Sequence, residues 1–270
     1  MDITFIGGGN MASALVGGLA AKGFAASRMR VVEISPEARA RIAGAHGVQC
    51  FERSADAAPY GDVVVLAVKP QQMREAAHAV APHLRSELVL SIAAGIRLTD
   101  LARWLGGYTR LARCMPNTPA LIGAGVTGLY ARPEVEPARR AQGQAVLEAV
   151  SEVIWVEDEA LLDPVTAVSG SGPAYVFFFI EALERAAREL GIEGGAARAL
   201  AVGTFRGAAE LAARSTEAPA TLRERVTSKG GTTERALAAM RADRVDEGIV
   251  RAVAAANERA RELGDELGRD

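Results

Sequence analysis

The sequence predicts an α/β protein in two parts: a doubly wound parallel sheet, then an all-helical region. Three observations predict this fold class. A strand, a glycine-rich turn and a helix open the chain at residues 3–21, and strands alternate with helices to residue 158. No convincing strand follows residue 157. Such alternation is typical of a parallel sheet covered by helices on both faces. We therefore expect one domain at residues 1–158 and a second, all-helical domain at 159–270 of the 270-residue chain.

The first strand and turn carry the fingerprint of a dinucleotide-binding domain. Residues 3–6 (ITFI) form a short apolar run, and Gly7, Gly9 and Ala12 fit the pattern G-x-G-x-x-G/A before a helix. Gly7 permits the tight turn, Gly9 lets a pyrophosphate approach the backbone, and Ala12 lets the helix pack on the strand. The helix N-terminus offers free N–H groups to phosphate. This context predicts a Rossmann-type domain.

The remaining elements of the first domain follow in order. We expect strands at residues 30–34, 48–51, 62–68, 88–92, 109–114, 125–130 and 152–156, and helices from residue 35, after residue 70 and near 134–149. The β-branched run at 62–68 is typical of a strand buried on both faces. Ligands of such sheets bind beyond the carboxyl ends of the strands. The loops Ala67–Pro70, Ala93–Gly95 and Met115–Pro119 should therefore line one crevice with the glycine turn.

Glu33 follows the second strand, about twenty residues beyond the glycines, where an acidic residue commonly accepts the adenosine ribose hydroxyls. A carboxylate there should repel the 2′-phosphate of NADPH by like charge. Ser35 and Arg39 lie close enough in sequence to offset part of this repulsion. We therefore expect NADH to be used well.

The second domain should consist of helices at residues 171–190, 196–214, 219–226, 232–240 and 244–263. Tyr175–Ile180 (YVFFFI) is apolar on every face of its helix, which requires burial all round. Five helices of this size cannot easily enclose such a segment. We therefore expect a homodimer or a larger assembly whose helical domains interlock.

Two glycine-rich helix starts are candidates for binding an anion: residues 169–173 (SGSGP) and 227–233 (TSKGGTT). Each offers backbone N–H groups and hydroxyls at a helix N-terminus. Serine and threonine there are also ordinary capping residues. Two such starts, with glycines beyond what capping needs, favour a site for a carboxylate.

Composition excludes several other classes of protein. The net charge of −2 gives no electrostatic case for nucleic acid or an anionic membrane. Cys50 and Cys114 have no metal-ligand spacing, and we expect no metal. The absence of a signal sequence or a long apolar run predicts a cytoplasmic protein. The three histidines lie on or beside predicted helices, so none is expected to be catalytic. Ser171 lacks the preceding strand of a nucleophile elbow.

Taken together, these motifs resemble pyrroline-5-carboxylate reductases. The matching segments are Ile6–Met11 (IGGGNM), Ala67–Pro70 (AVKP), Met115–Pro119 (MPNTP), Ser169–Tyr175 (SGSGPAY) and Thr227–Thr233 (TSKGGTT). They occur in the family's order and cover nearly the whole chain. There are two departures. Lys229 stands where the family usually has proline, and Glu33-Ile34-Ser35 stands where many members have an Asn-Arg-Ser type run.

The resemblance implies reduction of 1-pyrroline-5-carboxylate to L-proline with NADPH or NADH, the last step of proline biosynthesis. It implies homodimers, formed by the helical domain, that can assemble into decamers. It gives Thr233 a catalytic contact with the ring nitrogen and assigns the substrate to Gly230, Gly231, Thr232, Thr233, Ser169, Ser171 and Gly172. The expected cofactor-binding residues are Ile6, Gly7, Gly8, Gly9, Asn10, Met11, Glu33, Ser35, Ser54, Ala67, Val68, Lys69, Pro70, Ala93, Ala94, Gly95 and Asn117.

Two other classes of protein share parts of this pattern. A β-hydroxyacid dehydrogenase has the same two-domain plan, but its chemistry needs a lysine on the first helix after the Rossmann domain. Residues 171–190 contain none. A non-enzymic nucleotide sensor would not need the second anion loop at Thr227–Thr233.

Overall fold

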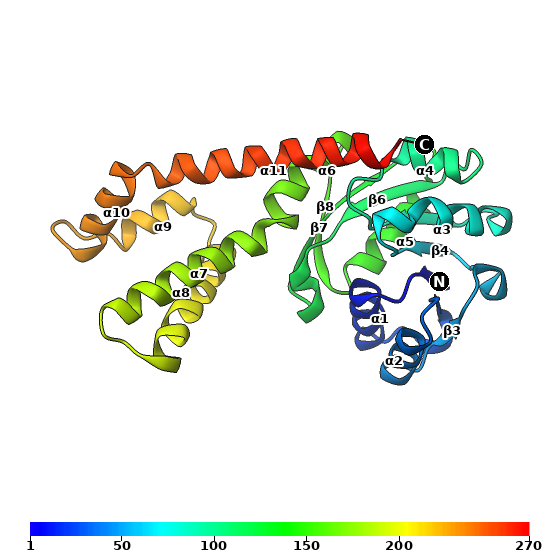
Figure 1. The fold of residues 1–270 in the computed structure, drawn as a ribbon, viewed down its shortest axis with the longest axis horizontal. Coiled ribbons are helices and arrows are strands. Elements are labelled where there is room, and N and C mark those ends of the chain that lie inside the picture. The colour runs from blue at the N-terminus through cyan, green and yellow to red at the C-terminus, as the bar shows by residue number, and fades with distance from the viewer. Residues whose placement is uncertain (270) are drawn as a thin grey trace. The chain divides into compact units, whose positions relative to one another are not determined.

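The computed structural model describes residues 1–269 of the chain (Figure 1). These residues form two compact units. The first contains Met1–Ser171 together with the chain from Ala256 onward, and the second contains Gly172–Ala255. The predicted boundary at residue 158 precedes this division. The assignment of domains to residues 1–158 and 159–270 stays a prediction.

Within the described residues, the first unit contains one eight-stranded sheet in the order β3-β2-β1-β4-β5-β6-β7-β8. The strands are β1 (Ile3–Ile6), β2 (Met29–Val32), β3 (Gln49–Phe51), β4 (Val63–Leu66), β5 (Leu88–Ser91), β6 (Leu111–Met115), β7 (Gly125–Ala131) and β8 (Ser151–Trp155). All pairings but one are parallel. The predicted α/β fold is confirmed.

The exception is the antiparallel pairing of β6 with β7, in which Arg113 lies opposite Tyr130. Only residues 116–124 separate these two strands. A parallel partner needs a crossover of a dozen or more residues, so the chain has to return antiparallel here. The expectation of a parallel sheet is therefore wrong at this one pairing. The pattern of apolar residues carries no information about strand direction, and the length of the connecting segment is the feature that does.

The predicted helices are present in the predicted order, and α4 is an additional helix that was not expected from the sequence. They are α1 (Asn10–Ala21), α2 (Pro36–His46), α3 (Met73–Val80), α4 (Leu98–Trp104), α5 (Pro137–Leu147), α6 (Leu162–Val165), α7 (Gly172–Glu189), α8 (Gly194–Arg214), α9 (Pro219–Arg225), α10 (Thr232–Ala242) and α11 (Val245–Leu267). Short 3₁₀ turns lie at Ala26–Arg28, Ser54–Ala57, Pro70–Gln72, Ala81–His83, Thr118–Ile122 and Glu159–Leu161. The sequence misses the helical segment at 159–170, which ends in a π-helix at Thr166–Gly170.

Two apolar cores lie on the two faces of the sheet. Val63 and Val65 of β4 belong to one core, whereas Val64 and Leu66 belong to the other. Successive side chains of a strand point to opposite faces, so β4 is buried on both sides. Helices α1, α2 and α5 supply the first core, and α3 and α4 supply the second.

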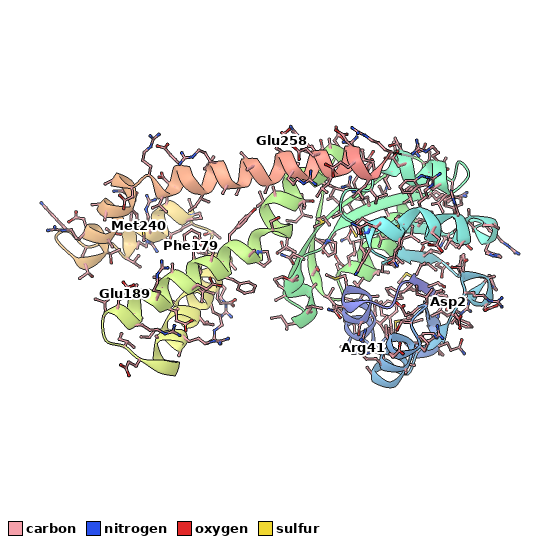
Figure 2. All side chains as sticks on the ribbon, viewed as in Figure 1. Asp2, Arg41, Phe179, Glu189, Met240 and Glu258 are labelled. Carbon is pink, nitrogen blue, oxygen red and sulfur yellow. The ribbon has the colours of Figure 1, made fainter. Side chains whose placement is uncertain are left out.

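The second unit leaves much of α7 uncovered. Phe177 and Phe178 are 58% and 69% exposed, and Val176 is 42% exposed. Phe179, labelled in Figure 2, contacts Phe205 of α8 with ring centroids 6.3 Å apart. One chain therefore buries only part of the apolar surface of this helix. Self-association would remove the remainder from water.

Gly18 and Gly44 provide a matched test of the packing of the first unit. A Cβ at Gly18 of α1 would lie 2.7 Å from the carbonyl oxygen of Ala149, whereas a Cβ at Gly44 of α2 would have no neighbour within 4 Å. We expect Gly18→Ala to destabilise the protein by about 1–3 kcal/mol through overpacking. Gly44→Ala should stabilise its helix by up to about 1 kcal/mol. Thermal unfolding at one protein concentration measures both, and equal midpoints would contradict this packing.

Candidate functional site

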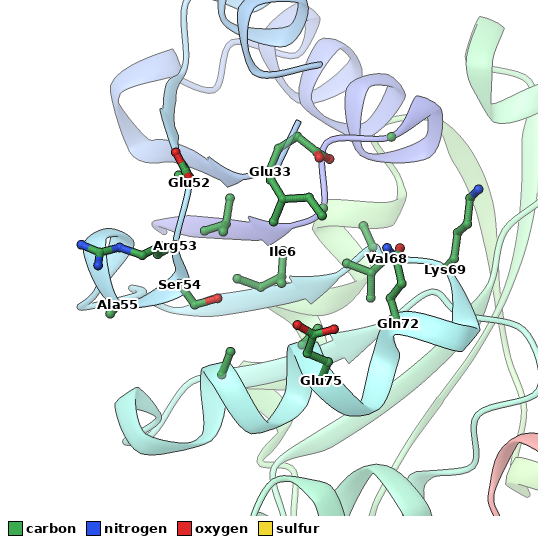
Figure 3. A pocket seen from close by; sticks show the side chains of 17 residues that line it. Ile6, Glu33, Glu52, Arg53, Ser54, Ala55, Val68, Lys69, Gln72 and Glu75 are labelled. Carbon is green, nitrogen blue, oxygen red and sulfur yellow. The ribbon is translucent and has the colours of Figure 1, made fainter. Parts of the chain in front are cut away.

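A pocket of about 630 Å³ lies beyond the carboxyl ends of β1, β2 and β4 and is closed on one side by α3 (Figure 3). Among the predicted cofactor residues it brings together Ile6, Gly7, Gly9, Glu33, Ser54, Ala67, Val68 and Lys69. Its other lining residues are Val32, Ile34, Glu52, Arg53, Ala55, Gln72, Glu75, Ala76 and Ala79. Beyond the carboxyl ends of parallel strands is where open α/β sheets bind ligands.

Gly7 makes the turn from β1 into α1 possible. Its φ is +105°, and a Cβ would lie 2.6 Å from the carbonyl oxygen of Ala67 at the end of β4. The Gly7 N–H donates to the carbonyl oxygen of Val32 at 2.7 Å. No other residue fits a left-handed backbone this close to a neighbouring main chain. The turn is therefore fixed between β2 and β4.

Gly9 exposes the start of α1. It is the N-cap residue and supplies no side-chain hydrogen bond to the helix. A Cβ there would have no neighbour within 4 Å. The first N–H groups of α1 have no intrahelical partner and lie at the positive end of the helix dipole. This arrangement fits the pyrophosphate of a dinucleotide.

Glu33 contacts the glycine turn (Gly7–Gly9) directly. Its Oε2 accepts a hydrogen bond from the N–H of Gly8 at 2.8 Å, and its Oε1 accepts one from the N–H of Ser35 at 2.9 Å. Each carboxylate oxygen keeps a further lone pair for a ligand hydroxyl. Glu33 therefore holds the glycine turn against the loop before α2, a role that the sequence does not reveal.

The two groups expected to offset the charge of Glu33 are used elsewhere. Ser35 accepts from the N–H of Ala38 and so caps α2. Arg39 donates to the carbonyl oxygen of Glu33 at 2.6 Å and pairs with Glu52 at 3.2 Å. The carboxylate of Glu33 therefore remains without an ion pair from Arg39.

The pocket carries three carboxylates and two cations along its lining. The carboxylates belong to Glu33, Glu52 and Glu75, and the cations to Arg53 and Lys69. Arg53 forms two 2.9 Å hydrogen bonds with Asp56, which hold the pKa of that carboxyl below its usual value. In Figure 3 its guanidinium extends away from Glu33 at the edge of the pocket.

The other predicted cofactor residues do not line this pocket: Gly8, Asn10, Met11, Ser35, Pro70, Ala93, Ala94, Gly95 and Asn117. Gly95 ends the loop after β5 with a φ of +74°, and a Cβ there would lie 2.9 Å from Leu267 Cδ1. The end of α11 therefore packs against this loop.

Asn117 joins three segments of the first unit. Its Nδ2 donates to the carbonyl oxygen of Ser169 at 3.2 Å, and its Oδ1 accepts from the N–H of Val126 at 2.9 Å. The residue is 9% exposed. Asn117 thus holds the loop after β6 against both β7 and the π-helix.

The π-helix at Thr166–Gly170 carries the first of the two predicted anion motifs. The Ser171 N–H donates to the carbonyl oxygen of Thr166 at 2.8 Å, five residues back. The Ser169 hydroxyl donates to the carbonyl oxygen of Val165 at 3.0 Å. Short π-segments within helices are frequent at functional sites. The only feature of the sequence that could indicate this π-helix is its run of small residues.

The second motif forms the loop before α10. Hydrogen bonds within the loop already occupy some of the backbone N–H groups that were expected to bind an anion. The Gly230 N–H donates to Glu234 Oε2 at 2.7 Å, and the Gly231 N–H donates to the carbonyl oxygen of Ser228 at 3.0 Å. Thr232 and Thr233 begin α10, so their N–H groups lack an intrahelical partner. Glu234 was missed, although a glutamate at the third helical position is a known capping signal.

Within residues 1–269, no group of three or more His, Cys, Asp or Glu residues is arranged to hold a metal ion. Burial raises the pKa of the thiols of Cys50 and Cys114, which disfavours the reactive thiolate. No helix in this part of the chain combines the length and apolarity needed to cross a bilayer.

The glycine turn, the uncapped start of α1 and the acidic residue after β2 define the class of protein: a dinucleotide-binding protein built on a Rossmann-type sheet. A family model described as coenzyme F420-dependent NADP oxidoreductase matches residues 2–95. A second model, pyrroline-5-carboxylate reductase dimerisation, matches residues 159–263. The chain therefore has an NADP-binding domain and a dimerisation domain that implies self-association.

Comparisons over the full length identify the family. A pyrroline-5-carboxylate reductase of Pseudomonas aeruginosa is 46% identical over 267 residues, which is 98% of each chain. The structure of one from Coxiella burnetii has a TM-score of 0.92 and 39% identity, covering 97% of this chain and 98% of that one. A Plasmodium falciparum pyrroline carboxylate reductase crystallised with NADP bound has a TM-score of 0.86 and 26% identity, over 98% of each chain. The chain belongs to the pyrroline-5-carboxylate reductase family and is an oxidoreductase.

The position of Glu33 generates a test of cofactor choice. Glu33→Gln removes the negative charge but keeps one carbonyl oxygen for the glycine turn. We expect it to raise the NADPH-to-NADH ratio of kcat/KM about fivefold, because a like charge at about 4 Å in water costs about 1 kcal/mol. Glu33→Ser should change the ratio in the same direction and also weaken both cofactors, since the contact with Gly8 is lost.

Glu52→Gln is the matched control, because Glu52 lines the pocket but its side chain is 67% exposed and paired with Arg39. Its effect on the ratio should be much smaller. Steady-state kinetics with each cofactor measure all three variants. An unchanged ratio in Glu33→Gln, or equal changes in Glu33→Gln and Glu52→Gln, would show that Glu33 does not discriminate.

Proposed function

We propose that this chain reduces 1-pyrroline-5-carboxylate to L-proline with NADPH or NADH, in the last step of proline biosynthesis. The observation that carries this proposal is the 46% identity, over 98% of each chain, to a pyrroline-5-carboxylate reductase. A glycine turn that leaves the start of α1 uncapped supports it, because that is the arrangement a dinucleotide needs.

The proposed chemistry needs no strong general acid. A bound nicotinamide supplies the hydride. The carbon of a protonated C=N bond accepts it, and the bond becomes CH–NH with no further proton required. Positioning and charge placement then carry most of the catalysis. This agrees with a site built from backbone amides, hydroxyls and the Asn117 amide.

The pyrophosphate and adenosine of the cofactor would be held by the first strands of the sheet, and its nicotinamide would lie beside the loops after β5 and β6. The start of α1 would hold the pyrophosphate, and Glu33 the adenosine ribose. Ser54, which lines the pocket and is 9% exposed, would contact the adenosine side. Ala94 and Asn117 would line the nicotinamide side. Glu33 would keep a free lone pair on each carboxylate oxygen for the ribose hydroxyls.

The substrate half would be formed by the two glycine-rich motifs. Ser169, Ser171 and Gly172 would shape the pocket. The N–H groups of Thr232 and Thr233 would hold the carboxylate at the start of α10, and the Thr233 hydroxyl would meet the ring nitrogen. Gly230, with a φ of +74°, gives the loop its bend. Gly230 and Gly231 would act through this loop geometry.

We also propose a homodimer formed through the helical domain, residues 159–270, with decamers as the higher assembly, and a cytoplasmic location. The exposed Phe177 and Phe178 of α7 support the dimer, because a second copy is the partner that the dimerisation-domain match implies.

Thr233→Ala tests the substrate half. Loss of one hydrogen bond to a charged group costs about 1.5–3 kcal/mol. The kcat/KM for pyrroline-5-carboxylate should therefore fall about tenfold to a hundredfold. Lys229→Pro is the matched change in the same loop. Lys229 is exposed, so this variant should keep most activity and mainly alter the salt dependence of KM.

Steady-state turnover of pyrroline-5-carboxylate, followed at the nicotinamide absorbance, measures both variants and the unmodified chain. If Lys229→Pro loses most of its kcat/KM while Thr233→Ala keeps it, the assignment of the polar contact to Thr233 is wrong. An unmodified chain that binds the cofactor but does not turn over this substrate would refute the proposed function itself.

A further inference from the structure

Strand β6 contains a buried arginine that the dinucleotide pocket does not use. The side chain of Arg113 is 5% exposed. Its Nη1 donates to Glu159 Oε1 at 3.2 Å, and its Nη2 lies 3.7 Å from Asp163 Oδ1. Glu159 Oε1 also accepts from the N–H of Leu98 at 2.8 Å. A planar guanidinium can meet two carboxylates at once in a fixed geometry, which an ammonium cannot.

Such a buried ionic cluster is weak evidence for a role in stability. Removing charges from water costs several kcal/mol per ion, and well-packed apolar residues often hold the same shape equally well. We therefore look for the role of this ionic cluster in the segment that it holds in place. Glu159 and Asp163 belong to the helical segment at 159–170, which continues directly into the π-helix.

Arg113 is the first of three alternate residues that contact this segment. Arg113, Met115 and Asn117 share one face of the strand and its extension, because side chains alternate along a strand. Met115 packs against Gly170, where a Cβ would lie 2.7 Å from Met115 Cε. Asn117 donates to the carbonyl oxygen of Ser169. Three successive residues of this face therefore each make one contact with the segment at 159–170. Arg113 makes an ionic contact, Met115 an apolar one, and Asn117 a hydrogen bond through its amide.

The neighbouring strand β7 completes this support. A Cβ at Gly128 would lie 2.7 Å from Val165 Cγ1, so α6 packs directly on the sheet there. The Val126 N–H donates to Asn117 Oδ1 at 2.9 Å. The position of the π-helix is therefore set by β6 and β7, whereas the dinucleotide pocket is lined from β1, β2 and β4.

We propose that Arg113, acting through Glu159 and Asp163, is a positioning residue for the substrate half of the site. It fixes the segment at 159–170 so that the π-helix presents Ser169 beside the loop Met115–Pro119. The inference rests on the proposed function for its kinetic consequences, but the ordering of the π-helix does not depend on which substrate is used.

The test compares Arg113→Met, Arg113→Lys and Asp163→Asn with the unmodified protein. Arg113→Met should lower kcat/KM for pyrroline-5-carboxylate by about tenfold to a hundredfold, the loss expected of a site displaced by about 1 Å. The Kd for NADPH, from its fluorescence, should stay within about twofold of the unmodified value, which is under 0.5 kcal/mol. Arg113→Lys should recover part of the loss, and Asp163→Asn should show a smaller effect in the same direction.

Hydrogen exchange gives a readout that needs no turnover. In Arg113→Met and Asp163→Asn, amides at residues 162–171 should exchange faster than in the unmodified chain, while those at 3–12 should not change. Asp163→Asn keeps the test decisive if Arg113→Met does not fold. Arg140→Met is the control, because Arg140 donates to the carbonyls of Val135 and Arg132, away from this segment. It should leave all these measurements unchanged.

Unchanged exchange at 162–171 together with unchanged kcat/KM would overturn the inference. A parallel loss of NADPH affinity, substrate turnover and exchange protection throughout the first unit would also overturn it, since Arg113 would then be purely structural. If the unmodified chain does not reduce pyrroline-5-carboxylate, the proposed function fails, and the exchange measurement still decides the role of Arg113.

Discussion

The close approach of the glycine turn to the end of β4 is the constraint on which the cofactor half depends. The Gly7 N–H bonds to Val32 of β2, the Ala67 N–H bonds to Ile6, and a Cβ at Gly7 would lie 2.6 Å from the Ala67 oxygen. The chain can leave β1 and enter α1 only through this left-handed residue. Because the turn is so short, the uncapped start of α1 lies at the same edge of the sheet as Glu33. The pocket follows from that placement.

The sheet divides the work of the proposed site between two groups of strands. Strands β1, β2 and β4 carry the groups for the pyrophosphate and adenosine of the dinucleotide, whereas β6 and β7 hold Asn117 and the π-helix. This division suits hydride transfer to an electrophilic carbon, which depends on holding two reactants in register. Substitutions on β6 should therefore act on the substrate and the nicotinamide side, and leave the contacts with the pyrophosphate and the adenosine ribose undisturbed.

Local sequence patterns predict the parts of this structure that local physics determines. The β-branched run of β4, the glycine turn and the proline and serine at the start of α2 each specify their own conformation. The two contacts of Asn117 depend on residues distant in sequence, so no local pattern reveals them. The reversed direction of β7, in contrast, follows from the short segment 116–124 between the two strands. The contact of Glu33 with Gly8 is hidden for the same reason, since the ribose motif predicts a ligand and not a backbone partner. The contact of Glu234 with the N–H of Gly230 could have been anticipated, because a glutamate at the third position of a helix is a local capping pattern.

If the proposed function holds, this chain positions a reduced nicotinamide against the C=N carbon of a cyclic imino acid. Transfer of deuterium tests it most directly. The protein is incubated with 1-pyrroline-5-carboxylate and NADPH deuterated on one face of C4, in two separate preparations, and the proline is analysed by mass spectrometry and NMR. We expect one deuterium at C5 of L-proline from one preparation and none from the other, because hydride is delivered from a single face of the nicotinamide. Unlabelled proline from both, labelled proline from both, or no proline at all would contradict it.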